Sequence, residues 1–172
     1  MNDHLEELLA VTHKQALEFF VLGLSDVCDG PVDRGELLYN ASVLAHHAQV
    51  STQHESGHPS PRSLTEVFDH FVLSYETTRY DAGVMETAGA QCLLLTGFFE
   101  GQMRARHNVL WYASLGREYY NRAAKLHRES RNARLLASVA KHFEPWRRCH
   151  ARLASELRDT PFLLRLRDSP QV

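Results

Sequence analysis

Apolar residues recur at three- and four-residue steps along most of the chain, which is the spacing of one face of an α-helix. The pattern is densest between residues 81 and 107. The apolar stripe of this segment consists of Met85, Ala88, Cys92, Leu95, Phe99 and Met103, and Leu93, Leu94 and Phe98 lie beside it. A helix that is apolar on nearly all sides must be covered on most of them, so the sequence predicts a central helix at 81–107.

The same periodicity predicts further helices before and after this segment. Ser63 and Glu66 have the spacing of a capping box, which predicts a helix start at Ser63, and Asn108 is a second predicted N-cap. Pro145 is expected to break or kink the helix that starts near residue 130. No segment has the alternating pattern of a strand, so the sequence predicts an all-α bundle of about six helices. The remaining predicted helices span about 3–24, 33–50 and 108–128.

Length and composition indicate one domain over residues 1–172. The chain is 44% hydrophobic and 23% charged, which is typical of a globular protein in water. Residues 51–62 are polar and rich in proline, glycine and serine, so we expect an exposed flexible loop there. We expect residues 168–172 to form a frayed tail.

The first residues and the cysteines suggest a compartment. The chain begins with an acidic segment where a signal peptide would be basic, and no apolar run is long enough to span a bilayer. We therefore expect a cytoplasmic protein without membrane contact. Cys28, Cys92 and Cys149 are odd in number and far apart. They indicate a reducing compartment, and neither a disulfide framework nor a zinc site is expected.

The near-zero net charge hides a difference between two parts of the chain. Residues 1–100 carry a net charge of −11 and residues 101–172 carry +9. In one interpretation the two parts pack together and neutralise each other. In another, the basic C-terminal half binds an acidic partner or a nucleic acid, or acidic and basic faces meet in an oligomer.

A possible metal motif lies in the polar loop. His54, Glu55 and His58 have the spacing of the HExxH zinc motif, in which a helix places both imidazoles on one face. Gly57 is a poor helix former and Pro59 disfavours helical geometry at His58, so we interpret the segment as a polar loop.

A second possible metal set is equally incomplete. Glu66 and His70 are four residues apart on the helix predicted from Ser63, but no matching pair lies on a neighbouring helix. A carboxylate-bridged metal centre needs ligands from several helices. We therefore predict no cofactor, and a metal-dependent enzyme using these residues or the loop motif stays an alternative.

The basic C-terminal half contains the candidate partner-binding residues. Trp146 lies next to Arg147 and Arg148, and an exposed tryptophan beside arginines is a common anchor in protein interfaces. The same segment, with Arg152, has the rhythm of a helix-turn-helix, which would place these arginines against nucleic acid. Phe162 opens a short amphipathic segment that either closes the bundle or docks on a partner.

The sequence contains no complete catalytic constellation, because it lacks a nucleophile elbow, a P-loop and a dinucleotide-binding glycine motif. Our leading hypothesis is a cytoplasmic, non-catalytic interaction or regulatory protein that forms a homodimer. The alternatives are a nucleic-acid-binding regulator and a metal-dependent enzyme.

Overall fold

The structure is a computed structural model that describes residues 3–53 and 80–159, with residues 3–12 and 50–53 described as backbone. Every regular element of these residues is an α-helix, which confirms the all-α prediction. The helices are α1 (Asp3–Val27), α2 (Arg34–Gln53), α5 (Ala82–Thr96), α6 (Glu100–Met103), α7 (Val109–Leu126), α8 (Ser130–Lys141) and α9 (Phe143–Asp159). None of them combines the length and the hydropathy needed to cross a membrane.

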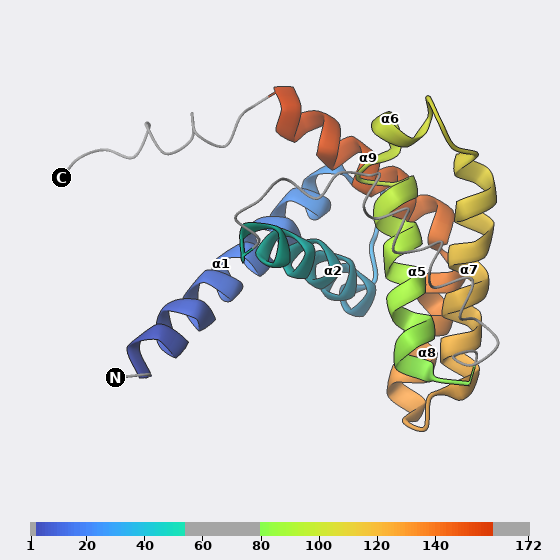
Figure 1. Cartoon of the computed structure of the whole chain (residues 1–172), viewed down its shortest axis with the longest axis horizontal. Helices are drawn as coiled ribbons and strands as arrows, with labels where there is room; N and C mark the ends of the chain where they lie inside the picture. Colours follow the sequence, from blue (N-terminus) through green and yellow to red (C-terminus); the bar gives the residue numbers. More distant parts are fainter. Residues whose placement is uncertain (1–2, 54–79, 160–172) are drawn as a thin grey trace.

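The helices form two groups, which lie side by side in Figure 1. Helix α1 packs against α2 to form an N-terminal hairpin, and α7 packs against both α5 and α8. Helix α9 contacts α1 of the hairpin as well as α5 and α7 of the second group. The last described helix therefore holds the two groups together.

The predicted central helix at 81–107 is shorter than expected. Its apolar stripe is confirmed, since Met85, Cys92 and Leu95 are fully buried, but α5 ends at Thr96 and the short α6 follows. The reason lies at Gly97, where a Cβ atom would stand 2.8 Å from the Cβ atom of His150. Because α9 crosses so closely, the chain leaves the helical path at this glycine.

The predicted N-cap at Asn108 is confirmed, whereas the helix break predicted at Pro145 lies at another residue. Asn108 caps α7, and its side chain accepts a hydrogen bond of 3.1 Å from the backbone N–H of Trp111. The chain does not break at Pro145 but at His142, between α8 and α9. Pro145 lies in the first turn of α9, where a helix does not need the missing N–H.

The predicted loop at 51–62 starts too early, because residues 51–53 belong to α2. Residues 54–62, the helix predicted from Ser63 and the tail predicted at 168–172 lie outside the described residues. The single domain at 1–172 stays a prediction.

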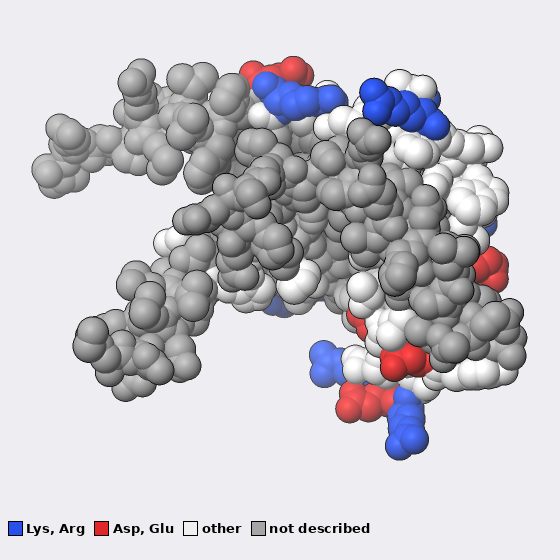
Figure 2. Space-filling model, in the orientation of Figure 1, with Lys and Arg blue, Asp and Glu red and all other residues white. Residues whose placement is uncertain are grey.

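Acidic and basic residues from the two parts of the chain meet within the bundle. On the coloured part of the face in Figure 2, both kinds of charge lie next to each other. This arrangement supports the interpretation that the two parts neutralise each other. Among the described residues, the ion pairs between the parts are Asp29–Arg152, Glu100–Arg104 and Glu100–Arg147, and the imidazoles of His142 and His127 lie within 4 Å of the carboxylates of Glu36 and Glu86.

The close contact between α5 and α7 generates a first prediction. A Cβ atom at Gly116 of α7 would lie 2.7 Å from the Cβ atom of Cys92 and 2.5 Å from the ring of Phe143. We expect Gly116→Ala to lower the free energy of unfolding by about 2 kcal/mol through overpacking. Urea denaturation measures this loss.

Gly83→Ala is the matched control, because the nearest atom to a Cβ there is an Asp81 oxygen at 3.4 Å. We expect this helical substitution to raise stability by about 0.5 kcal/mol. Equal stabilities for the two variants would contradict the close packing of α5 on α7.

Candidate functional site

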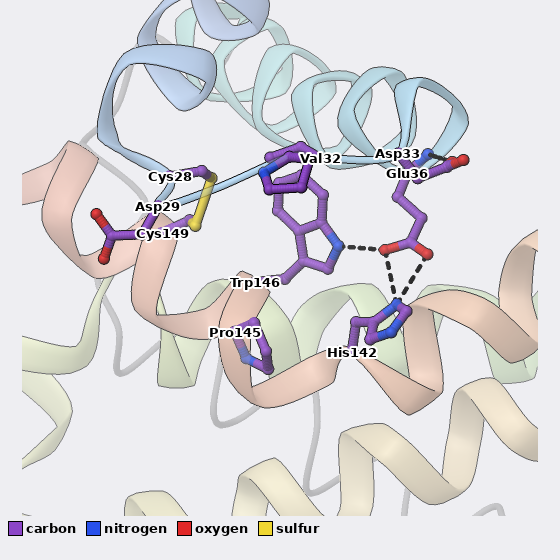
Figure 3. A pocket seen from close by; sticks show the side chains of 10 residues that line it. Cys28, Asp29, Val32, Asp33, Glu36, His142, Pro145, Trp146 and Cys149 are labelled. Carbon is purple, nitrogen blue, oxygen red and sulfur yellow. Dashed lines mark hydrogen bonds and ion pairs between the residues drawn. A yellow bond between two sulfur atoms is a disulfide. The ribbon is translucent and has the colours of Figure 1, made fainter.

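A pocket of about 180 Å³ lies between the hairpin and the helices α8 and α9. Its lining combines acidic residues with an imidazole, an indole and two sulfur atoms, and Figure 3 shows these side chains. The lining residues are Cys28, Asp29, Pro31, Val32, Asp33, Glu36, His142, Pro145, Trp146 and Cys149. The pocket opens along the contact between the two helix groups, which we call the hairpin interface.

Glu36 of α2 is the central polar residue of the hairpin interface. Only 3% of this residue is exposed. Trp146 Nε1 donates a hydrogen bond of 2.6 Å to its carboxylate, His142 Nδ1 lies 2.9 Å from it, and the Ser138 hydroxyl donates a third bond. All three donors come from α8, α9 and the residue that joins them. One carboxylate of the hairpin therefore binds both C-terminal helices.

The hydrogen bonds fix the protonation of this group. Burial raises the pKa of the Glu36 carboxyl, but the bonds from Ser138, Trp146 and His142 together outweigh burial and hold the pKa below its usual value. An ionised carboxylate can only accept, so Nδ1 of His142 carries the donated proton. The imidazole of His142 is half-exposed.

A disulfide bond joins Cys28, just after α1, to Cys149 of α9, with the two Cα atoms 5.3 Å apart. The expectation that the cysteines form no disulfide is therefore wrong. The two residues are 121 positions apart, and such a separation has no spacing signal in the sequence. The third cysteine, Cys92, is free and buried in the core, and burial raises the pKa of its thiol.

Two further contacts complete the hairpin interface. The Asn40 side chain of α2 accepts a hydrogen bond of 2.9 Å from Nε2 of His150, and burial lowers the pKa of this histidine to about 3. Arg152 donates to the carbonyl of Val27 at 3.2 Å and to the carboxylate of Asp29. Helix α9 therefore binds the hairpin on both sides of the disulfide.

The prediction of an exposed Trp146 is wrong. Trp146 is 4% exposed, because its indole lies in the hairpin interface between the disulfide and the Glu36–His142 pair (Figure 3). A tryptophan between a proline and two arginines has the local pattern of a surface residue. Its hydrogen-bond partner Glu36 is 110 residues away in the sequence. Trp146 therefore holds helices together within the chain.

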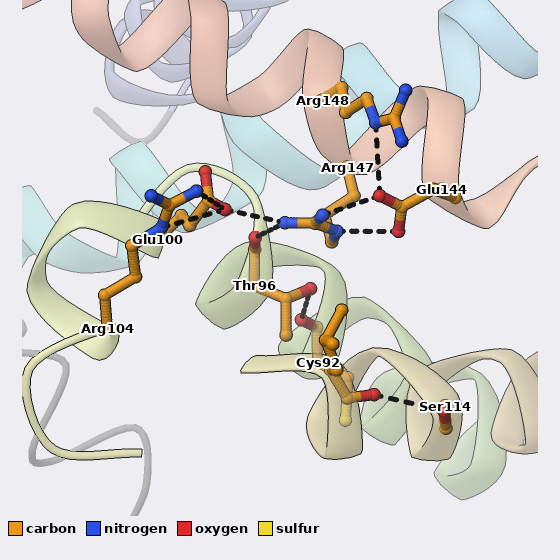
Figure 4. Close-up of polar contacts among 9 residues, drawn as sticks. Cys92, Thr96, Glu100, Arg104, Ser114, Glu144, Arg147 and Arg148 are labelled. Carbon is orange, nitrogen blue, oxygen red and sulfur yellow. Dashed lines mark hydrogen bonds and ion pairs between the residues drawn. The ribbon is translucent and has the colours of Figure 1, made fainter. Parts of the chain in front are cut away.

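Arg147 is also buried, so the expectation of a surface arginine is wrong for this residue. Its guanidinium donates to the Thr96 carbonyl at 3.0 Å and to Glu100 at 2.9 Å, and it forms two bonds with Glu144 (Figure 4). The guanidinium holds the pKa of Glu144 below its usual value. A positive charge at the carbonyl end of α5 also stabilises that helix terminus.

The remaining candidates for partner binding have different positions. Arg148 and Arg152 have exposed side chains, but Arg148 pairs with Glu144 at 3.2 Å and Arg152 pairs with Asp29. Their role at a partner surface stays a prediction. Phe162 lies outside the described residues.

The metal candidates His54, Glu55, His58, Glu66 and His70 all lie outside the described residues. Within residues 3–53 and 80–159, no group of three or more histidine, cysteine, aspartate or glutamate side chains is arranged to hold a metal ion.

Comparison of the chain with protein-family models, with curated proteins and with solved structures finds no match. The chemistry of the pocket therefore follows from its own residues. A disulfide can exchange with a thiol, in which case a sulfur–sulfur bond breaks and another forms. The imidazole of His142 is oriented by its hydrogen bond to Glu36.

The buried carboxylate generates a second prediction. We expect Glu36→Gln to lower the free energy of unfolding at pH 7 by about 2 kcal/mol, because charge-assisted hydrogen bonds are replaced by neutral ones. The low pKa of folded Glu36 stabilises the fold above the ordinary glutamate pKa, and this contribution disappears as the pH falls through the folded-state value. The difference between wild type and variant should therefore shrink below about pH 4.5.

Urea denaturation from pH 7 to pH 3.5 tests this dependence, with Glu118→Gln on the exposed face of α7 as the control. We expect the control to match the wild type within about 0.5 kcal/mol. A difference for Glu36→Gln that stays constant with pH would contradict an ionised carboxylate at this position.

Proposed function

We propose that this chain is a non-catalytic interaction protein whose N-terminal hairpin is locked and released by the Cys28–Cys149 disulfide. The observation that carries the proposal is the position of this bond, which joins the hairpin to α9 at an open pocket. Apart from this bond, the described contacts across the hairpin interface are noncovalent. Breaking one covalent bond therefore weakens the contact between two helix groups that share one hydrophobic core.

The compartment forms part of the proposal. We place the protein in the cytoplasm, where thiol pools keep most cysteines reduced and disulfides are usually transient or redox-sensing. In that compartment the disulfide forms under oxidising conditions and is reduced again when the concentration of reduced thiols rises. A reversible disulfide of this kind suits a regulatory protein better than a permanent structural disulfide does.

The proposed partner is a second copy of the chain, bound through the start of α7. Leu110 is 69% exposed and the neighbouring Trp111 is 51% exposed. Large apolar side chains of this kind, tryptophan above all, are enriched in the cores of protein interfaces. The helix face beyond them carries Ser114, Arg117 and Glu118, which supplies a polar rim.

Nucleic-acid binding through the C-terminal arginines finds less support. Each of Arg147, Arg148 and Arg152 forms an ion pair with a carboxylate, and such pairs compete with phosphate. A single residue, His142, joins α8 to α9, which leaves no room for the turn of a helix-turn-helix.

The redox proposal generates a third prediction. The bond closes a loop with a sequence separation of 121, and such a crosslink adds about 5 kcal/mol by restricting the unfolded chain. In urea denaturation, we expect the free energy of unfolding of the oxidised protein to exceed that of the reduced protein by about this amount. Cys28→Ala should abolish the difference, and Cys92→Ala should retain it.

Hydrogen exchange tests where the structure responds. On reduction, amide exchange should accelerate by a larger factor in α1 and in the first turns of α2 than in α5 and α7. Uniform acceleration over all helices, or none, would rule out a hairpin that responds separately.

The proposed dimer generates a fourth prediction. The double variant Leu110→Ser/Trp111→Ser should sediment as a monomer, and the wild type should sediment as a dimer. Leu22→Ser is the matched control, because Leu22 is equally exposed at 67% but lies on α1. A wild type that is monomeric at every concentration, or a double variant that remains dimeric, would exclude this surface.

A further inference from the structure

We propose that the pocket at the hairpin interface admits small cationic or neutral thiols, such as aminothiols, which reduce the Cys28–Cys149 bond in the folded protein. This inference rests on the proposed redox function and adds the class of molecule that acts on the bond. It follows from three properties of the pocket, which are its size, the unequal exposure of its two cysteine residues and the charge of its exposed lining residues.

The size of the pocket limits the reductant. A volume of about 180 Å³ accommodates a thiol of a few heavy atoms. Both cysteines line this pocket, so a molecule inside it reaches the disulfide without prior separation of the helix groups.

The exposure of the two cysteines differs. Cys28 follows the last turn of α1 and is half-buried, whereas Cys149 lies within α9 and is 9% exposed. An incoming thiolate therefore attacks Sγ of Cys28. The disulfide bond breaks, its electron pair leaves on Sγ of Cys149, and that sulfur takes up the proton which the attacking thiol had lost.

A second molecule of thiol completes the reduction. It attacks the sulfur of the first molecule in the mixed disulfide, and Cys28 leaves as a thiolate and is protonated. Two small thiols are then oxidised to one small disulfide, and the protein disulfide is reduced to two thiols. The same steps in reverse, with the small disulfide as the oxidant, restore the bond.

The charge around the pocket selects the thiol. Asp29 and Asp33 are exposed lining residues, and the ionised Glu36 lies deeper. Arg152 pairs with Asp29 and offsets one of these charges. The remaining negative potential attracts an ammonium group and repels a carboxylate, by roughly threefold in local concentration for each unit of ligand charge at a distance of several ångströms.

The experiment compares three small thiols that differ in charge, namely 2-aminoethanethiol, 2-mercaptoethanol and mercaptoacetate. The rate of reduction of the oxidised full-length protein is followed at pH 8 by alkylation and intact mass, and is expressed per thiolate. Each rate constant is divided by that of the same thiol toward a small neutral disulfide, because the nucleophilicity of a thiolate rises with its pKa. We expect this ratio to be roughly tenfold higher for the cationic thiol than for the anionic one. The difference should shrink in 0.5 M salt, where exposed charges are screened.

Variants assign the selectivity to the pocket. Asp29→Asn/Asp33→Asn should reduce the tenfold ratio to about twofold or less, and asparagine at position 33 can still cap α2. Glu118→Gln removes a carboxylate on α7 far from the pocket and should leave the ratio unchanged.

The outcomes separate the two proposals. If the oxidised protein contains no Cys28–Cys149 bond, both proposals fail. If the bond is present but the three thiols reduce it equally fast, or if the rate levels off at the unfolding rate, only the proposal of an acidic thiol pocket is overturned.

Discussion

The buried carboxylate of Glu36 is the interaction on which the arrangement of the helices depends. An ionised group can remain in the interior only when donors replace the water it has lost. Here the donors are Ser138, His142 and Trp146, which surround the point where α8 gives way to α9. If α9 shifted by one turn, the carboxylate would lose its partners, so the charge fixes how the hairpin sits on the C-terminal helices.

Two polar centres of this kind position α9, and they differ in character. At the hairpin interface an anion of α2 is bound by donors of α8 and α9. At the opposite contact a cation of α9, Arg147, is bound by the end of α5 and by Glu100. Apolar packing alone would let α9 slide along its neighbours, because such contacts have little directionality. The two buried charges specify one register.

The sequence predicts those features that depend on neighbouring residues. The cap at Asn108 and the buried stripe of α5 are local patterns, and both are confirmed. The end of α5 at Gly97 is different, because it follows from the approach of His150 in another helix. The prediction of an exposed Trp146 is wrong for the same reason, because Glu36, which accepts a hydrogen bond from its indole, is 110 residues away in the sequence. The pocket is lined by residues 28–36 and 142–149, which are far apart in the sequence, so it has no local pattern.

The disulfide also constrains the order in which the chain can mature. Cys28 is synthesised early, and its disulfide partner Cys149 is synthesised 121 residues later. During this interval Cys92 is the other thiol available within the chain, and its burial in α5 removes it from competition once that helix has packed. Docking of α9 on the hairpin brings the Cα atoms of Cys28 and Cys149 to 5.3 Å, a separation that suits a disulfide bond. In the folded molecule the bond therefore reports that the last described helix lies on the hairpin.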